Sequence, residues 1–504
     1  MKQDKITKVL TYFYLMPLAI MVIFNAVNSL LRTTYFELYR DMETAKYRWD
    51  NPLLVLLFSA VLLMLLYLLW KLGLRAKIGS GKVAVGFAGL MSLFFVLLFK
   101  CIATCDSEAL SQIAIEFSKN NFAAFEQGSY LYSYSFQIGM TALLEVIYRI
   151  FGVEKFIVFQ LLNVISIMII IGLLHKITKM LFEDEKVQQM EGILSLGMLP
   201  LFLFATFVYG DIIGWAFGVG TIYFMIQYLQ TDKWQPVVKA ALLLMIGTVI
   251  KSNINILVVA AVIVIILKAF TAKKYQMLIW AVAFLLCSQV GVNVVNAVYV
   301  QRAGLESYPA GIPKIAWIAM SMQEADEGGY ACGWYNAYNW DVYAANHYDR
   351  ELTTAACVEN LKESMNKFLH EQKYTLEFFY KKYTSQWNAP TFQAMITNEW
   401  ATRGVEGLSD FANFLIYGFG RDILYGMMNV YHFVMFFLCG VFFVLKRKEW
   451  SLPKAYFMLN IFGGFLFHMI WEAQSRYILG YFVLMLPLAA AGCNALFDRA
   501  KIRE

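Results

Sequence analysis

Two carboxylates stand one residue apart, at Asp106 and Glu108, directly after an apolar run over residues 83–99. The run is long enough to cross most of a bilayer as a helix, so both acids sit where that helix ends. Charge at this depth is costly, and acids placed there usually mark a function. A carboxylate can act as a general base. The plainer alternative is that both acids only end the helix in water.

Three further ends of apolar runs carry polar or charged residues. These are Tyr209 and Asp211, then Lys251 and Asn253, and last Glu472, Gln474, Arg476 and Tyr477. Arg binds phosphate bidentately and Lys acts as a point charge, so this set can hold a lipid phosphate whose head group reacts. The two cations would stabilise the leaving phosphate. Asp106, Glu108 and Asp211 form the catalytic acidic set, and Asp106 would take a proton from an acceptor hydroxyl.

Each of these residues also has a structural interpretation. Asp211 could cap the helix that follows it, because Asp is a favoured N-cap. Lys251 could extend its ammonium to the membrane surface. Arg476 could pair with Glu472, four residues earlier on the same helix face, and Tyr477 could belong to an interfacial aromatic belt. The pairing of Arg476 and a phosphate role are compatible.

Metal and disulfide chemistry are left open by the sequence. Asp106, Glu108 and Asp211 are hard oxygen ligands that suit a divalent cation such as Mg or Mn, but no spacing requires one. The seven cysteines show no metal-binding pattern. Cys332 and Cys357 lie in one long polar segment and could form a disulfide if that segment is extracytoplasmic.

The composition is that of a membrane protein. Of 504 residues, 60% are hydrophobic and 15% are charged, whereas a soluble chain is about 45–50% apolar and about 25% charged. The net charge of +6 does not indicate nucleic-acid binding, because the basic residues form short clusters between apolar runs. Such clusters are topology signals. We therefore expect an all-α polytopic membrane protein.

Apolar runs of about 15–23 residues recur about twelve times, and in lipid each must be helical. They cover residues 12–31, 52–70, 83–100, 156–175, 191–209, 212–229, 236–250, 254–268, 276–298, 424–445, 454–470 and 477–496. If these helices alternate, every basic cluster falls on the cytoplasmic side. The connector 31–51 is then outside despite four basic residues, and all four polar helix ends share the outer side.

The first outer loop needs a separate interpretation. A further span over 130–152 would reverse every later basic cluster, and this stretch also carries Glu145 and Arg149 four residues apart. We therefore predict that 107–127 and 130–152 lie on the outer membrane surface. A tilted ordinary span is the alternative.

A later connection, residues 299–420, is too long for a simple loop and is predicted to be an extracytoplasmic insertion. The predicted division is accessory helices over 1–82, a core over 83–298, the insertion over 299–420 and the last helices over 421–504.

The order of these features resembles the GT-C superfamily of membrane glycosyltransferases. It is most similar to the family-39 type, which includes protein O-mannosyltransferases and lipid A aminoarabinose transferases. Asp106 matches the acid of the first outer loop, and Asp211 the acid of a later helix end. Lys251 opens a span as in that family, and Arg476-Tyr477 precedes a last span that contains proline.

The sequence departs from the family pattern in three places. The stretch 134–136 lacks the Pro-Pro pair that the family often shows in its first loop, and Asp-Ser-Glu replaces Asp-Glu at 106–108. In addition, two helices precede the matching part. These departures bear on the subfamily and on the acceptor.

The resemblance implies an inverting transfer from a polyprenyl-phosphate sugar, with Asp106 as base and Lys251 and Arg476 on the donor phosphate. It implies a cell-envelope glycan, lipid or protein as acceptor, no nucleic acid, and an extracytoplasmic site in a bilayer, expected to be the bacterial cell membrane. The alternative function is a multi-span transporter or lipid flippase, although few charges fall in mid-span. A third possibility is a non-catalytic assembly partner.

Overall fold

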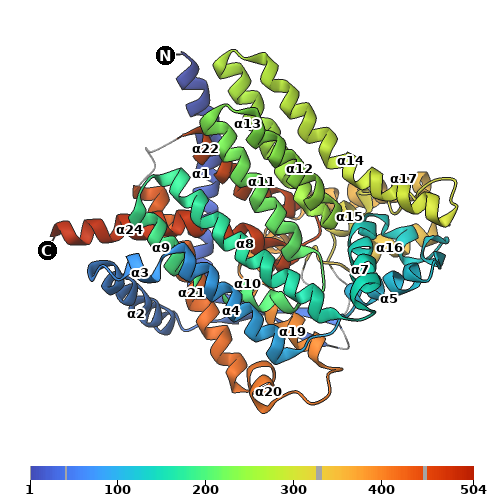
Figure 1. The fold of residues 1–504 in the computed structure, drawn as a ribbon, viewed down its shortest axis with the longest axis horizontal. Helices are drawn as coiled ribbons and strands as arrows, with labels where there is room; N and C mark the ends of the chain where they lie inside the picture. The colour runs from blue at the N-terminus through green and yellow to red at the C-terminus, as the bar shows by residue number, and fades with distance from the viewer. Residues whose placement is uncertain (1, 40–41, 325–331, 446–450, 504) are drawn as a thin grey trace.

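The computed structural model describes residues 2–39, 42–324, 332–445 and 451–503 (Figure 1). These residues are mostly helical, as the sequence predicts, with one β-hairpin as an addition. Eight helices are long and apolar enough to cross a membrane, or up to ten if two bent pairs each count as one span. The predicted number of about twelve is therefore not confirmed for the described residues.

The helices of the eight candidate spans are α1 (Lys2–Leu31), α2 (Pro52–Lys71), α4 (Gly81–Phe99), α8 (Phe156–Phe182), α11 (Asp211–Thr231), α13 (Ile256–Ala272), α14 (Leu278–Ala303) and α21 (Phe419–Leu445). The missing spans have local causes. The run 191–209 breaks into α9 (Glu185–Ser195) and the short α10 (Leu199–Leu203), which are inclined by 51°. In addition, α12 (Trp234–Ile250) is too short to qualify.

Two of the spans form the centre of the molecule. In α11 and α21, 72% of the apolar window is buried inside the protein, against 22% in α2 and α14. α11 packs against α8 and α12, and α21 packs against α1 and α24 (Leu486–Arg503). Close packing of α24 depends on Gly492, because a Cβ there would meet the Leu438 carbonyl oxygen at 1.9 Å.

The connector 31–51 contains an antiparallel hairpin of β1 (Arg32–Tyr39) and β2 (Met42–Trp49). Its backbone joins the insertion, where Thr34 N–H donates to the Asn388 carbonyl over 3.0 Å. Phe36 is fully buried, with its ring centre 4.9 Å from that of Trp334. The guanidinium of Arg32 stacks over the Tyr47 ring at 4.7 Å. The hairpin is thus fixed to the segment 332–420, whereas the sequence predicts only a loop of mixed charge.

The first outer loop holds α5 (Asp106–Ser118) and α7 (Ile138–Phe151), and neither qualifies as a span. α7 exposes Val146, Ile150 and Phe151 on one side, as a helix on a membrane surface would. In Figure 1, α5 and α7 lie at the same end of the long helices as α15 (Ile315–Met320) and α16 (Tyr338–Ala345).

The predicted pair of Glu145 and Arg149 in α7 is present, and it belongs to a larger group of interacting residues. Glu145 is buried and lies 2.8 Å from Arg149, and it also accepts hydrogen bonds from Arg302 and Tyr299 of α14. Burial alone would raise the pKa of Glu145. The bonds from Arg302, Tyr299 and Arg149 outweigh it and hold the pKa below its usual value.

We expect Glu145→Gln to destabilise the protein by about 3 kcal/mol near neutral pH, because it leaves Arg302 without its charge partner. A lowered folded-state pKa gives stability above the unfolded pKa that is lost as pH falls through the folded value. The parent should therefore lose its advantage over the variant in acid. Thermal unfolding in detergent at several pH values measures this, with exposed Glu126→Gln as control. Equal melting curves at pH 7 would contradict it.

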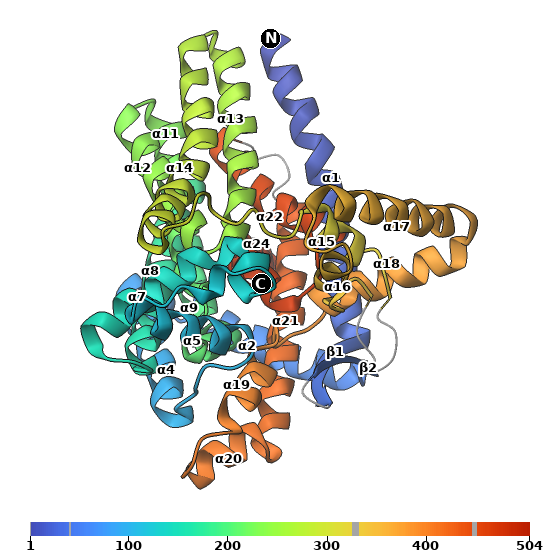
Figure 2. The same ribbon diagram turned by 90° about the vertical axis from the view of Figure 1, so that its right-hand side faces the viewer.

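Residues 299–420, which the sequence predicts to be an extracytoplasmic insertion, are mostly helical where the structure describes them. The longer helices are α17 (Arg350–His370) and α18 (Gln372–Trp387), which project sideways as a pair (Figure 2). α19 (Ala394–Thr402) returns to the membrane helices and α20 (Asp410–Ile416) follows it. Cys332 and Cys357 are buried free thiols, so the disulfide left open by the sequence is not formed.

Candidate functional site

Three of the four polar helix ends meet around two tyrosine rings. The Lys251 ammonium, just after α12, lies 3.0 Å from Oδ2 of Asp211, the first residue of α11. It also lies 4.4 Å from the ring centre of Tyr209 and 5.2 Å from that of Tyr477. The guanidinium of Arg476, in α23 (Ser475–Val483), lies 5.6 Å and 5.3 Å from the same two rings. Lys251 and Arg476 thus come from distant parts of the chain and lie over the same two rings. The rings of Tyr209 and Tyr477 are called the tyrosine cradle below.

Asp106 reaches this cradle from the first outer loop. The Tyr130 hydroxyl donates to Asp106 Oδ1 over 3.1 Å. Burial raises the pKa of Tyr209 well above its usual value, and the negative charge of Asp106 adds to the shift. The exposed Asp106 carboxylate therefore lies within electrostatic reach of the ring between the two cations. An exposed acid that faces a buried cation pair can take a proton from one reactant while the cations hold another.

Local backbone geometry sets the direction of Asp106. Cys105, the residue before it, has φ +51°, which is unusual for a residue other than glycine. Ser107 stabilises the turn, because its hydroxyl oxygen accepts a hydrogen bond from the Thr104 N–H over 2.9 Å. As the first residue of α5, Asp106 also faces the positive end of the helix dipole. Strained backbone of this kind often occurs at functional sites.

The ionic cluster opens into a narrow apolar pocket. Asp211 and Arg476 both line it. The other lining residues are Ile170, Leu201, Phe204, Ile212, Trp215, Val219, Leu479, Gly480 and Val483. With a volume of only about 10 Å³, this pocket has room for no more than one water molecule, so it marks a narrow gap between packed helices beside the ionic cluster.

Two residues that the sequence did not indicate complete the cluster. The Gln393 side chain accepts the Arg476 backbone N–H over 3.0 Å and the Ser475 hydroxyl over 3.3 Å, and it donates to Glu43 of the hairpin. Burial raises the pKa of Glu43, Arg476 opposes the shift and Asp106 adds to it. Glu43 is therefore a further acid beside the cations. No sequence signal could place a hairpin residue next to a helix end more than 400 residues away.

The structure corrects two of the alternative interpretations. The N-cap of α11 is Gly210, so Asp211 does not cap the helix and instead pairs with Lys251. Glu472 and Arg476 are not on one helix face, because α22 (Leu452–Ile470) ends before residues 471–474 and α23 begins at Ser475. The i,i+4 pairing therefore has no helix to support it.

Other predicted residues have a less direct place. Glu108 is exposed in the first turn of α5, and its negative charge acts on Cys105. Asn253 is half-buried in the turn after Lys251 and makes no side-chain hydrogen bond to the described residues. Gln474 is 8% exposed, and its side-chain oxygen is buried without a partner among the described residues.

Burial raises the pKa of Glu472 to about 7, and the positive charge of Arg476 opposes the shift. A folded-state pKa above the unfolded value of about 4.3 means that stability is lost as pH rises from about 4.3 through about 7. We expect the melting temperature of the parent to fall between pH 5 and pH 8, and Glu472→Gln to flatten that dependence. The control is exposed Glu306→Gln. Parallel profiles for parent and Glu472→Gln would contradict the assignment.

The described residues contain no group of three or more His, Cys, Asp or Glu side chains that could hold a metal ion. The acids Asp106, Glu108 and Asp211 that suggested Mg or Mn therefore form no such group. We assign no metal ligand and attach no step of the chemistry to a metal.

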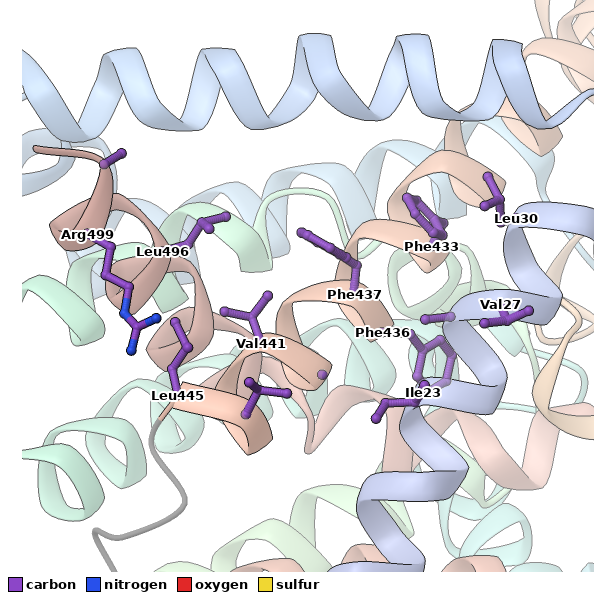
Figure 3. A pocket seen from close by; sticks show the side chains of 14 residues that line it. Ile23, Val27, Leu30, Phe433, Phe436, Phe437, Val441, Leu445, Leu496 and Arg499 are labelled. Atoms are coloured by element: carbon purple, nitrogen blue, oxygen red, sulfur yellow. The ribbon is translucent and has the colours of Figure 1, made fainter. Parts of the chain in front are cut away.

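A second, wider cavity of about 650 Å³ lies between α1, α21 and α24 (Figure 3). Its lining is apolar except for Arg499, and it contains side chains such as Ile23, Phe433 and Leu496. None of the predicted site residues lines it. Without an acid, and with one cation, this cavity cannot carry out group transfer.

Comparison with known proteins identifies part of the chain. Residues 137–292 match the model of a family described as dolichyl-phosphate-mannose-protein mannosyltransferase. This segment contains Tyr209, Asp211, Lys251 and Asn253, and the match confirms the resemblance predicted from the sequence. No curated protein sequence matches the chain.

Among solved structures, the apo oligosaccharyltransferase of Archaeoglobus fulgidus is similar, with 12% identity and a TM-score of 0.45. The match covers 84% of this chain and 51% of that one, so the chain spans about half the length of that protein.

Proposed function

We propose that this chain, whose residues 137–292 match the family described as dolichyl-phosphate-mannose-protein mannosyltransferase, is a membrane glycosyltransferase. Its donor in this proposal is a polyprenyl-phosphate sugar. One observation carries the proposal. The Asp211–Lys251 pair and Arg476 come from distant helix ends, yet both cations lie over the same two tyrosine rings, and the charge of Asp106 acts on one of these rings. This arrangement suits a lipid phosphate with a reactive head group.

The proposed reaction is a single displacement with inversion. Asp106 takes the proton of an acceptor hydroxyl, and that oxygen forms a bond to the anomeric carbon. The bond from the anomeric carbon to the phosphate oxygen breaks, and polyprenyl phosphate leaves with the electron pair. Positive charge placed where negative charge develops is the main source of rate in such a step.

Arg476 and Lys251 have different parts in this scheme. The Arg476 Nε is buried without a hydrogen-bond partner among the described residues, so it can donate to a phosphate oxygen. Lys251 already has Asp211 as a partner. Burial lowers the pKa of Lys251, and the charge of Asp211 works against that shift. Arg476 is therefore the principal phosphate ligand, and Asp211 positions Lys251 as a second positive charge.

The remaining polar groups are assigned to the donor sugar and to the shape of the site. The unpartnered side-chain oxygen of Gln474 can accept a hydrogen bond from a sugar hydroxyl, and Glu472 lies on the same irregular segment. Tyr209 and Tyr477 separate the two cations. We assign Asn253 and Glu108 to the edge of the site.

The proposed site lies on the extracytoplasmic side of a bacterial cell membrane, where the positive-inside rule places these helix ends. The acceptor is a component of the cell envelope. The segments 1–82, 83–298, 299–420 and 421–504 act as accessory helices, core, outer insertion and last helices. In this arrangement the insertion borders the site through Gln393.

A transfer assay tests the proposal. The purified full chain in lipid nanodiscs is supplied with a radiolabelled polyprenyl-phosphate sugar and a cell-envelope extract as acceptor. We expect label to move from the lipid to acceptor material. The same chain in sealed liposomes distinguishes a transporter or flippase, and movement of the labelled lipid across the bilayer without any transfer would contradict the proposal.

A further inference from the structure

A continuous set of aromatic side chains begins at the ring that binds Asp106. The Tyr130 ring, whose hydroxyl binds Asp106, lies 5.0 Å from the Tyr134 ring, and Tyr134 stacks on Trp340 at 5.8 Å and 23°. The hydroxyls of Tyr134 and Tyr335 are 3.2 Å apart. Phe136 completes the set, which is called the aromatic ledge below.

The ledge is open to solvent, although it is packed internally. Phe136 is 43% exposed and Tyr335 is 39% exposed, while Tyr130, Tyr134 and Trp340 are half-buried. It is built from two segments far apart in sequence, the first outer loop and the outer insertion. The Trp317 ring lies behind Phe136 at 5.7 Å and fixes it. The ledge is therefore a preformed surface that begins at the proposed catalytic base.

Negative charges act on the ledge, whereas the two cations assigned to the donor phosphate lie over other rings. Burial raises the pKa of Tyr134, and the negative charges of Asp106 and Glu472 add to the shift. The cation–ring contacts of Lys251 and Arg476 fall on Phe207, Tyr209 and Tyr477 instead. Among the described residues, no Lys or Arg lies over a ring of the ledge.

We infer that the aromatic ledge is the acceptor subsite and that the acceptor is an uncharged glycan. The inference rests on the proposed function. A pyranose presents C–H groups on its faces and hydroxyls on its edge, so it can stack on the aromatic rings while its hydroxyls pair with those of Tyr134 and Tyr335. A phosphorylated or carboxylated acceptor would be repelled by the Asp106 carboxylate. A hydroxyl of the sugar nearest Tyr130 would then face Asp106.

Binding to the full chain in nanodiscs tests the inference with four probes. They are a mannose tetramer, an N-acetylglucosamine tetramer, a phosphorylated mannose tetramer and an uncharged hexapeptide that contains Ser and Thr. We expect at least one neutral tetramer to bind, as measured by saturation-transfer NMR. Trp340→Ala should weaken that binding about tenfold, since a ring–sugar stack of roughly 1.4 kcal/mol is lost. Tyr134→Phe, which keeps the ring and removes a hydroxyl, should have a smaller effect.

The matched control is Trp234→Ala, which removes an exposed tryptophan at the start of α12, far from the ledge in the chain. Polyprenyl-phosphate binding is measured for each variant and shows whether the site is folded. The inference is overturned if the phosphorylated tetramer or the peptide binds at least as tightly as both neutral tetramers. It is also overturned if neither neutral tetramer binds, or if Trp340→Ala binds as the parent does.

The failure of this inference can be told apart from failure of the proposed function. Polyprenyl-phosphate binding that depends on Arg476, without glycan binding, removes the acceptor assignment alone. Loss of both kinds of binding in the parent protein removes the glycosyltransferase as well.

Discussion

Asp106→Asn should lower kcat about 10²–10⁴-fold, the usual range for loss of a general base, while polyprenyl-phosphate binding stays close to that of the parent. The amide has nearly the same shape and still accepts the hydrogen bond from Tyr130. It cannot take the proton of the acceptor hydroxyl. A single-turnover transfer assay with labelled donor, together with a donor-binding titration, separates the two effects.

The control for this prediction is Glu108→Gln, two residues along the same exposed turn of α5. The charges that act on the Tyr209 ring include those of Asp106 and Asp211. We expect a much smaller loss than for Asp106→Asn. Equal losses in both variants, or a normal rate for Asp106→Asn, would show that Asp106 is not the base.

Arg476→Ala has the second large expected effect. It should reduce kcat about 10²–10³-fold and weaken polyprenyl-phosphate binding, because the buried donor that faces the leaving oxygen is removed. Arg476→Lys keeps the charge but loses the planar fork that binds phosphate bidentately, so it should recover only part of the activity. The backbone bond from Arg476 N–H to Gln393 is available in both variants.

The measurement is kcat and the donor dissociation constant for both variants, with Arg48→Lys as the control. Arg48 is exposed on the hairpin and pairs with Asp50 at 3.8 Å, so its replacement should leave both constants unchanged. Unaltered donor affinity in Arg476→Ala would show that the phosphate binds elsewhere.

The sequence was most informative where an ionic residue interrupts an apolar run. Asp106, Asp211, Lys251 and Arg476 stood out because a charge at the end of a membrane helix is costly and must have a partner or a task. The positive-inside rule then placed them on one side. In the structure, Asp211, Lys251 and Arg476 lie around the same two tyrosine rings, and the charge of Asp106 acts on one of them.

The contributions of Glu43 and Gln393 to the site could not be predicted from the sequence. Both depend on how the hairpin and the outer insertion fold back over the membrane helices, which is set by contacts such as Phe36 with Trp334. These contacts join segments hundreds of residues apart and leave no periodic pattern. The suggested i,i+4 pairing of Glu472 with Arg476 was wrong for a different reason. It assumed helical spacing, but residues 471–474 are irregular.

The sequence predicts about twelve spans, whereas eight to ten qualify among the described residues, because apolar length alone cannot show where a helix breaks. The run 191–209 looks continuous in composition, yet it bends by 51° between α9 and α10. Bent and short helices of this kind surround the site, where Tyr209 and Lys251 lie between helices. Irregular backbone at membrane depth is tolerated where it lines a protein cavity, so the errors in span number fall near the functional residues.

A cryo-EM structure of the full chain with polyprenyl phosphate bound tests the central claim most directly. The account predicts phosphate density within hydrogen-bonding distance of the Arg476 guanidinium, with Lys251 beside it and Asp106 facing the vacant sugar position. Phosphate density at Arg499, with the tail in the wider cavity between α1 and α21, would contradict it.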